Sequence, residues 1–538
     1  MKYIDYRDLP HQTNLFLDYV YDFEKVAQFY TGNFRSENDL SNYIKTYNPD
    51  RINRLDLCKA LISQNKDETK AMHNIELLTE RNTFVIATGQ QLGFMGGPLY
   101  TIYKIFTAIK LVDLMSEKFP DYNFIPLFWM ESEDHDFSEI NKVKIFDKTN
   151  NFFTHQYCPT GYIPETNLGS SGKIILDSEI NAFNNNILNT LQITEYTPIV
   201  KNLLSVYSEG KTNEDCFINF LSELVEGTGL VFLNPNSIEI KKLLRPIFEK
   251  ELLEFPKTSE FIIDISAKLE EIYHAQVKAR PINLFYHHKK GRFLIEPSGA
   301  DYSLKGIRQK FSKDEIMEQL NNTPEVFSPN VILRPICQDF ILPTFMYVAG
   351  PSEIAYFAQI NSVYNYFDMK MPIIYPRASA TLVENKIHNL IEKFNLNLLE
   401  LSANYSGVQK RVTDNMSDIK IGEEFEKTFL EINNVFANLE NITKNIDVTL
   451  IDNLKTTKEK IEHLFKVYQE KLYNAQKRNN NVALEQLERV KNNIFPKGNL
   501  QERELNLIYY INKYSNSITD KIYHELDITS FQHQLIDL

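Results

Sequence analysis

Two short apolar runs flank an amphipathic stretch in the first third of the chain. Phe84–Ala87 and Phe124–Met130 are the apolar runs, and glycine bounds the first. Between them, Leu99–Lys118 places apolar residues near helical spacing, directly after Pro98, which suits a first helical turn. Continuous apolar runs are typical of buried strands in parallel sheets. The pattern therefore predicts a strand–helix–strand unit with parallel strands.

Similar patterns return in the next third of the chain, after a mostly helical start at residues 1–81. They predict a strand at 229–235 with a helix at Ser237–Glu254, a hairpin at Ile282–Pro297, a strand at Ser328–Pro335, a strand ending at Val348 and a strand with a loop at Pro372–Ser379. His287 and His288 lie in the hairpin. Because adjacent strand residues face opposite sides, we expect them to share no metal ion.

A heptad pattern replaces the strand signals beyond Ala380. Apolar residues step by four and three over Phe425–Leu439 and again over Ile461–Ala475, with an interruption around Asp447–Asp452. Two long antiparallel helices are the simplest arrangement of this pattern. An intramolecular hairpin accounts for it without a partner, and a seam with exposed flanks also supports a homodimer.

The charge balance argues against a broad nucleic-acid surface. The 538 residues include 58 Lys and Arg against 71 Asp and Glu, which gives a formal net charge of −13. Binding to nucleic-acid phosphates requires basic residues. We therefore expect no nucleic-acid partner.

Cysteine usage and hydropathy indicate a cytoplasmic location. The four cysteines are widely spaced, which favours free thiols in a reducing compartment over disulfides or a structural zinc site. Residues 1–20 lack the apolar core of a signal peptide. The most apolar stretch, Phe340–Pro351, is too short to cross a bilayer, so no membrane partner is expected.

A glycine-rich turn and an acidic motif follow the first two predicted strands. Gly89, Gln90, Gln91, Gly93 and Gly97 belong to the turn, and Glu133, Asp134, His135 and Asp136 to the motif. Both lie at carboxyl ends of parallel strands, where open α/β sheets bind ligands. Free N–H groups at the following helix start favour an anion. A tight turn and a solvated loop are the structural alternatives.

The stretch Ser328–Ala380 carries a second set of polar candidates. It contains Asn330, Arg334, Gln338, Asp339, Gly350, Glu353, Arg377 and Ser379. Glu353 falls in the first turn of a predicted helix, where a carboxylate is stabilised by the helix dipole. Capping and the binding of a substrate ammonium group or metal ion are therefore equally open for Glu353.

Six sequence blocks stand out along the chain, in the order ATGQQLGFMGGPLYTIYK, PLFWMESEDHDFSEI, SPNVILRPICQDFILPT, VAGPSEIAYFAQI, PRASATLVENK and FPKGNLQERELN. In sequence and in order, these blocks resemble the BshC family, the cysteine ligases of bacillithiol biosynthesis. The resemblance implies an α/β, Rossmann-like core related to class I aminoacyl-tRNA synthetases, with inserted connecting segments and a long antiparallel coiled coil. It also implies a homodimer and the ligation of cysteine to glucosaminyl malate.

With this resemblance, the chain divides into segments that match the predicted elements. They are 1–150 for the first half of the core, 151–226 for an inserted segment, 227–380 for the second half of the core with the hairpin near 282–297, 381–495 for the coiled coil, and 496–538 for a helical segment that packs on the core.

The leading functional hypothesis is an ATP-dependent ligase that joins the cysteine carboxylate to an amine. Activation as an acyl-adenylate or acyl-phosphate requires a phosphate cradle, positive charge and a base. The glycine turn is the candidate cradle, Arg334 and Arg377 the candidate cations, and His135 the candidate base. Glu133, Asp134 and Asp136 are candidate Mg²⁺ ligands through their oxygens. Arg377 stands where class I synthetases carry their phosphate-contacting loop, and its planar fork suits phosphate.

Two features keep other interpretations open. The HIGH-type motif of class I synthetases is replaced by Gln90–Gly93, and the Lys-rich loop by Pro376–Ser379, which questions adenylation by the synthetase mechanism. A nucleotide pocket at the base of the coil, formed by Lys497, Gln501, Arg503 and Asn506, competes with salt bridges that fix the coil. A non-catalytic coiled-coil scaffold and a nucleotidyl or glycosyl transferase are the alternative functions.

Overall fold

The computed structural model describes residues 2–65, 68–164, 166–416, 420–479 and 481–538. The chain forms two compact units. The core unit comprises Met1–Thr381 and Gln501–Ile536, and the coil unit comprises Leu382–Leu500 and Asp537–Leu538. Within the described ranges, no helix is both long and apolar enough to cross a bilayer.

A parallel sheet with the strand order β13-β12-β2-β3-β6 forms the centre of the core unit. The strands are β2 (Thr83–Gln91), β3 (Asn123–Glu131), β6 (Val231–Leu233), β12 (Thr344–Ala349) and β13 (Ile373–Pro376). From β2 the chain first adds strands on one side, as β3 and β6, and later on the other, as β12 and β13. The order therefore reverses between β2 and β12, as in a Rossmann-like fold.

The helix between the first two strands is the predicted one. It is α5 (Tyr100–Lys118), which packs against β2 and β3. Most of its residues are buried. The predicted helix after β6 is α10 (Ile238–Glu254), and α14 (Pro351–Phe357) follows β12 directly. The sequence prediction of a parallel α/β core is confirmed.

The predicted strand at Ser328–Pro335 is wrong beyond its first residues. Strand β11 covers only Phe327–Pro329, and α13 runs over Leu333–Ile341. The Asn330 side chain accepts hydrogen bonds from the backbone N–H groups of Ile332 and Leu333, so it ends the strand and starts the helix. Pro335 lies in the first helical turn, where no backbone N–H is required.

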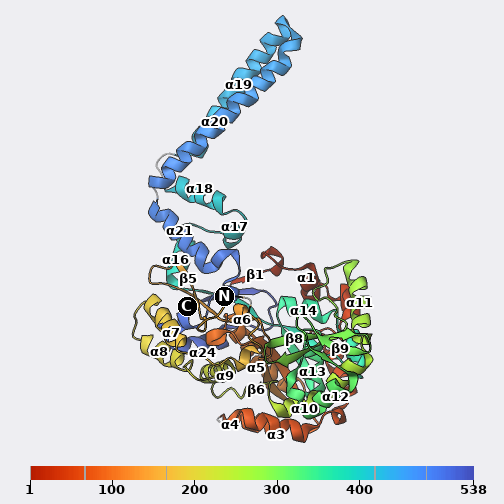
Figure 1. The fold of residues 1–538 in the computed structure, drawn as a ribbon. Coiled ribbons are helices and arrows are strands. Elements are labelled where there is room, and N and C mark those ends of the chain that lie inside the picture. The colour runs from red at the N-terminus through yellow and green to blue at the C-terminus, as the bar shows by residue number, and fades with distance from the viewer. Residues whose placement is uncertain (1, 66–67, 165, 417–419, 480) are drawn as a thin grey trace. The chain divides into compact units, whose positions relative to one another are not determined.

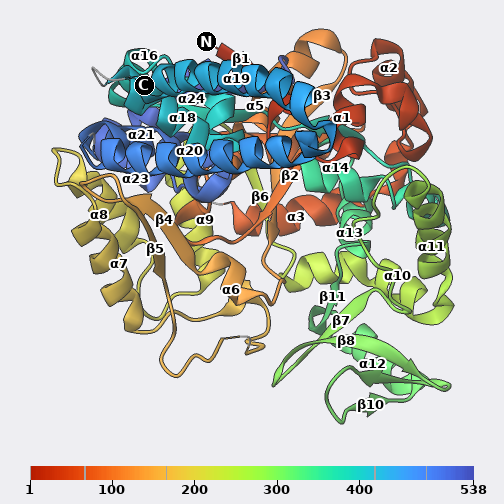
Figure 2. The same cartoon turned by 90° about the horizontal axis from the view of Figure 1, so that it is seen from above.

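The predicted hairpin is confirmed and belongs to an antiparallel sheet with the order β10-β9-β8-β7-β11. Its strands are β7 (Leu284–His288), β8 (Gly291–Ser298), β9 (Asp301–Leu304), β10 (Lys310–Phe311) and β11, and α12 (Lys313–Asn322) packs on it. Figure 2 shows these elements gathered at one corner of the core unit.

Further helices and short strands complete the core unit. They are β1 (Lys2–Ile4), α1 (Asn14–Tyr21), α2 (Glu37–Thr46), α3 (Arg54–Gln64), α4 (Thr69–Leu77), α6 (Phe137–Ile140), β4 (Lys142–Phe146), β5 (Phe152–Gln156), α7 (Glu179–Thr190), α8 (Thr197–Ser205), α9 (Asn213–Leu224), α11 (Lys257–Glu270), α15 (Asn361–Tyr366), α22 (Gln501–Glu504), α23 (Ile508–Tyr514) and α24 (Ser517–Glu525). β1 pairs with the C-terminal strand β15 (His533–Asp537), so the two chain ends meet.

The coil unit contains the predicted pair of long helices, α19 (Ile421–Ile446) and α20 (Ile451–Asn479). They run side by side in Figure 1, and the ring of Phe465 lies 6.4 Å from those of both Phe425 and Phe429. The heptad residues therefore meet across an intramolecular seam. The shorter helices of this unit are α16 (Asn385–Lys393), α17 (Leu398–Ala403), α18 (Tyr405–Asn415) and α21 (Asn481–Ile494).

Candidate functional site

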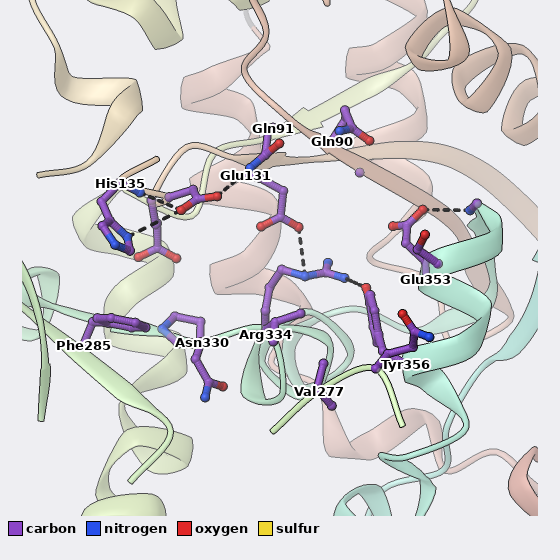
Figure 3. Close-up of a pocket in the computed structure, with 18 of the residues that line it drawn as sticks. Gln90, Gln91, Glu131, His135, Val277, Phe285, Asn330, Arg334, Glu353 and Tyr356 are labelled. Atoms are coloured by element: carbon purple, nitrogen blue, oxygen red, sulfur yellow. Dashed lines mark hydrogen bonds and ion pairs between the residues drawn. The ribbon is translucent and has the colours of Figure 1, made fainter. Parts of the chain in front are cut away.

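A cavity of about 910 Å³ opens where the strand order reverses. The ends of β2 and β3, the turn between β12 and α14, the start of α13 and the hairpin β7–β8 all contribute to its walls (Figure 3). Of the residues predicted from sequence, those that line it are Gly89, Gln90, Gln91, Glu133, Asp134, His135, Asn330, Arg334, Gly350, Glu353, Arg377 and Arg503. The carboxyl ends of parallel strands thus bring together residues that lie far apart in sequence.

The cavity is basic although the whole chain is acidic. Among the described lining residues, eight are Lys or Arg and four are Asp or Glu, whereas the chain carries −13. The basic residues are Lys104, Lys278, Arg280, Arg292, Lys305, Arg334, Arg377 and Arg503. Such a local excess of positive charge favours anionic ligands.

The acidic motif after β3 divides into residues with different surroundings. Glu133 is buried and forms an ion pair with Lys241, whose ammonium group is fully buried and also donates to the Phe327 carbonyl. Asp136 is exposed and lies outside the lining of the cavity. Only Asp134 and His135 of the motif are half-buried within the cavity wall.

Asp134 is an ionised acceptor. Gln91 Nε2 donates to its Oδ2 at 2.6 Å, and the backbone N–H of His135 donates to its Oδ1 at 2.7 Å. Burial alone would raise the pKa of Asp134, but the hydrogen bond from Gln91 and the charge of Arg292 outweigh it and hold the pKa below its usual value. Asp134 therefore supplies a fixed negative charge to the cavity.

His135 lies between charges of opposite sign. Its Nδ1 lies 3.3 Å from Arg292 Nη1 and 3.5 Å from Asp134 Oδ1, and its ring centroid lies 5.6 Å from that of Phe285. Burial and then the charge of Arg292 lower the pKa of His135 from its ordinary value. The imidazole is therefore neutral near pH 7.

Glu131 is a cavity residue that the sequence analysis did not select, although it lies two residues before the acidic motif. Its Oε1 lies 2.9 Å from Arg334 Nε, and Arg334 Nη2 donates to the Tyr356 hydroxyl at 2.5 Å (Figure 3). Burial raises the pKa of Glu131 to about 7, Arg334 opposes that rise, and the nearby carboxylates of Asp134 and Glu353 add to it. Glu131 therefore changes charge near neutral pH.

Glu353 caps its helix and also forms an ion pair. Its Oε2 accepts from the Gly350 backbone N–H at 2.8 Å, and its Oε1 accepts from the Tyr347 hydroxyl at 2.9 Å. Lys104 Nζ lies 2.5 Å from Oε2. The capping role is present, and Lys104 compensates the charge of Glu353. The sequence signal for Lys104 was a lysine within an otherwise buried helix.

The glycine turn packs tightly. A Cβ on Gly89 would lie 2.7 Å from the Trp129 carbonyl oxygen, and one on Gly93 would lie 2.7 Å from the Gly97 Cα. The Leu99 backbone N–H at the start of α5 donates to the Leu505 carbonyl at 2.9 Å. These contacts support the tight-turn alternative. Gly93 and Gly97 line a neighbouring cavity of about 300 Å³ that shares Gln90 and Gln91 with the main one.

Other predicted residues are engaged in packing. Arg377 Nη2 lies 2.5 Å from Glu502 Oε1, and the Ser379 hydroxyl donates to Glu502 Oε2 at 2.9 Å, all three side chains being buried. Gln338 Nε2 donates to Asp339 Oδ1 at 2.9 Å, and both side chains are buried and lie outside the lining of the cavity. Arg377 is thus the member of this group that reaches the cavity, with its charge already compensated.

The four residues predicted at the base of the coil belong to two different units of the chain. Arg503 lines the cavity, whereas Asn506 donates to the carbonyls of Met95 and Gly97 and thereby fixes the glycine turn. Gln501 is buried in the core unit, and Lys497 belongs to the coil unit.

The carboxylates predicted as Mg²⁺ ligands do not converge. Glu133 is paired with Lys241, Asp134 faces Gln91, and Asp136 is exposed. In the part of the chain that the structure describes, no group of three or more His, Cys, Asp or Glu side chains is arranged to hold a metal ion. These residues therefore do not fit a resident Mg²⁺ site.

Comparison with known proteins covers the whole chain. Residues 1–378 match the family model "Bacillithiol biosynthesis BshC, N-terminal Rossmann-like domain", and residues 380–538 match "Bacillithiol biosynthesis BshC, C-terminal coiled-coil domain". A solved arginyl-tRNA synthetase-like structure from Campylobacter jejuni aligns with a TM-score of 0.23 at 9% identity, over 85% of this chain and 98% of that chain. That score is too low to bear on the fold.

Relatives of full length agree with the family models. Proteins named "Putative cysteine ligase BshC" are 32% identical in Salinibacter ruber and 35% identical in Chloroherpeton thalassium. Each alignment covers 97% of this chain and 96% of the relative. The chain therefore belongs to the BshC family of bacillithiol biosynthesis.

Proposed function

We propose that this protein is an ATP-dependent ligase that joins the carboxylate of cysteine to the amine of glucosaminyl malate. The observation that carries the proposal is the basic cavity at the reversal of strand order, with eight Lys and Arg side chains in an acidic chain. Nucleotide phosphates and the carboxylates of both organic substrates are the anions it would hold. The naming of the relatives as cysteine ligases supports the same substrate class.

Three basic side chains of the cavity are available to bind the phosphate groups of ATP. Lys278, Arg280 and Arg503 are exposed cavity residues that form no ion pair with any described residue. Arg334 and Arg377, in contrast, are paired with Glu131 and Glu502. In this proposal Mg²⁺ arrives with ATP as part of the substrate.

Activation of a carboxylate requires transfer of adenylate or phosphate to it, and the amine then attacks the activated carbon. The acceptor enters as an ammonium group, which suits the negative charges of Asp134 and Glu131. It must lose a proton before it becomes a nucleophile. His135, as predicted from the sequence, and Glu131 are the candidate bases in the cavity.

We further propose a cytoplasmic homodimer that associates through α19 and α20. Apolar side chains remain uncovered on both helices, including Val435 and Ile442, each 54% exposed, and Leu464, 65% exposed. Uncovered apolar side chains repeated along a helix favour association with a second helix. The cytoplasm supplies ATP and the reducing conditions that suit the unpaired cysteines.

Purified protein incubated with ATP, Mg²⁺, cysteine and glucosaminyl malate, followed by mass spectrometry, tests the proposal. We expect the amide product together with AMP or ADP. His135→Ala and Asp134→Ala should lose product formation, whereas the neighbouring Asp136→Ala should retain it because Asp136 lies outside the cavity. A wild-type protein that consumes no ATP and forms no amide would contradict the proposal.

A further inference from the structure

The hydrogen bond between Arg292 and His135 limits which imidazole nitrogen can carry the proton. A guanidinium group only donates, so Nδ1 of His135 accepts in the 3.3 Å contact with Arg292 Nη1. A neutral imidazole whose Nδ1 is an acceptor carries its proton on Nε2. The carboxylate of Asp134 lies farther from Nδ1, at 3.5 Å, and its Oδ1 already accepts from a backbone N–H.

Arg292 is held rigidly for this contact. It is only 6% exposed, its Nε donates to the Ser328 hydroxyl at 2.8 Å, and its Nη2 donates to the Pro329 carbonyl at 2.6 Å. The guanidinium also lies over the ring of Phe285, 4.0 Å from its centroid. These contacts join the hairpin β7–β8, strand β11 and the acidic motif, so Arg292 cannot easily turn away from His135.

Glu131 offers what His135 lacks, an uncommitted acceptor atom in a side chain that lines the cavity. Its Oε1 is engaged by Arg334, but its Oε2 makes no hydrogen bond with a described residue. The side chain is 25% exposed in the cavity wall. A carboxylate with one oxygen fixed and the other uncommitted is well placed to accept a proton from a bound ammonium group.

We infer that the proton-transfer roles are divided: Glu131 accepts the proton of the acceptor amine, and His135, oriented by Arg292, donates a hydrogen bond through Nε2–H. Arg292 is thus a positioning residue, and the inference rests on the proposed ligase function. In the step, the amine nitrogen forms a bond with the carbonyl carbon of activated cysteine. Before attack, the ammonium group gives one proton to Glu131 and becomes the neutral amine. The bond from the carbonyl carbon to the phosphate oxygen then breaks with its electron pair on the leaving phosphate, which takes up the second proton that the nitrogen loses as the amide forms. Nε2–H stabilises the oxygen that gains negative charge.

The charged groups around both residues support this division. Asp134, Asp136 and Arg292 act on His135, and His287 faces it from β7. Burial and then the charge of Arg292 lower the pKa of His135 in spite of the two carboxylates, whereas burial raises the pKa of Glu131 to about 7. A base is most effective when its pKa lies near the working pH, which favours Glu131.

The tautomer of His135 is measured independently of catalysis. The experiment is NMR of protein with ¹⁵N-labelled histidine. Because the chain has eleven histidines, the signals of His135 must be assigned, and they are the two-bond ¹H–¹⁵N correlations that disappear in His135→Gln. We expect the neutral Nε2–H tautomer at pH 7, and a partial loss of that tautomer in Arg292→Lys. An imidazolium ion or the Nδ1–H tautomer at pH 7 would overturn the inference.

Kinetics of matched variants test both roles in the reaction. Glutamine at position 135 retains a neutral donor near Nε2, so His135→Gln should keep about a tenth of the amide-forming rate while His135→Ala loses about 10²-fold. Glu131→Gln should lose about 10²–10⁴-fold in amide formation but retain cysteine-dependent ATP consumption. The inference fails if His135→Gln is as inactive as His135→Ala and Glu131→Gln ligates at the wild-type rate. If the wild type forms no amide, the ligase function is refuted instead. The tautomer of His135 would then still show whether its imidazole can act as a base or only as a hydrogen-bond donor.

Discussion

Lys104 and Glu353 form an ion pair across the point where the strand order reverses, with 2.5 Å between Nζ and Oε2. Lys104 lies on α5, which follows β2, and Glu353 lies on α14, which follows β12. Lys104 also donates to the Gly89 carbonyl at 2.7 Å and to Gln90 Oε1 at 3.1 Å. One buried ammonium group therefore joins the two strand ends that frame the cavity.

Replacement of Lys104 should destabilise the core unit. Lys104→Met leaves the largely buried carboxylate of Glu353 without its partner, and removing one member of a buried ion pair costs about 3 kcal/mol. The measurement is urea unfolding followed by the fluorescence of Trp129, the single tryptophan, which is buried in β3 beside Gly89.

The double variant Lys104→Met/Glu353→Gln is the matched control. It removes both charges, so it should be more stable than Lys104→Met alone. Equal unfolding midpoints for wild type and Lys104→Met would mean that this pair does not hold the two strand ends together.

The pH dependence of amide formation should follow Glu131. Burial raises its pKa to about 7, and a base acts only when deprotonated, so the rate should fall as the pH drops below about 7. Arg334→Gln removes the positive charge that opposes this rise and should move the acid limb to higher pH. Steady-state rates of amide formation between pH 5.5 and 9 would show this shift. If the rate of Arg334→Gln falls at the same pH as that of the wild type, another group titrates.

The stability of the core unit should decrease in mild acid because of His533. Its Nδ1 lies 2.7 Å from the Ser379 hydroxyl, its Nε2 lies 2.9 Å from that of Thr381, and burial lowers its pKa to about 4. The unfolded chain takes up this proton below about pH 6.5 and the folded chain does not, so the stabilising effect is present above pH 6.5 and lost as the pH falls towards 4. Between pH 7 and 5 the loss amounts to about 2 kcal/mol.

Urea unfolding at both pH values checks this loss. In His533→Gln, the loss of unfolding free energy between pH 7 and 5 should be smaller by about 2 kcal/mol. Substitution of the exposed His524 by glutamine should leave the wild-type loss unchanged. The same pH sensitivity in His533→Gln would assign the effect to other groups.

A charge on the uncovered apolar face of α19 should prevent dimer formation. Ile442→Glu places a carboxylate among exposed apolar side chains. Because burial of a charge is unfavourable, this carboxylate destabilises the dimer, in which a second copy would bury it, and leaves the monomer unaffected. Sedimentation velocity should show a wild-type dimer and a monomeric variant, with unchanged Trp129 unfolding. The adjacent exposed Asn441→Glu is the control and should remain dimeric; a wild-type monomer would contradict the proposal.

Sequence periodicity was sufficient for the elements that are buried or regularly repeated. β2, α5 and β3 follow from apolar runs because both faces of the sheet are covered, and the α19–α20 pair follows from its heptads. The prediction failed at Ser328–Pro335, where a local hydrogen-bonding choice decides the structure. The side chain of Asn330 accepts from the backbone N–H groups of Ile332 and Leu333 at the start of α13, and a hydropathy pattern does not reveal such a contact.

The candidate site was only partly accessible from sequence because its electrostatics depend on distant partners. The positions of Asp134 and His135 follow from their place after a strand, but the neutralisation of Glu133 depends on Lys241 and the pairing of Arg377 on Glu502. Arg292 lies on a hairpin that shows no chemical motif. Its importance appears only when the fold brings it to His135.

The most direct test of the central claim uses cysteine labelled with ¹⁸O in its carboxylate, together with ATP and glucosaminyl malate. Activation of the carboxylate by ATP transfers one labelled oxygen to the leaving phosphate group. We therefore predict one ¹⁸O in AMP or in inorganic phosphate for each amide formed, as measured by mass spectrometry. Amide formation without ATP, or with label absent from both AMP and phosphate, would contradict the account.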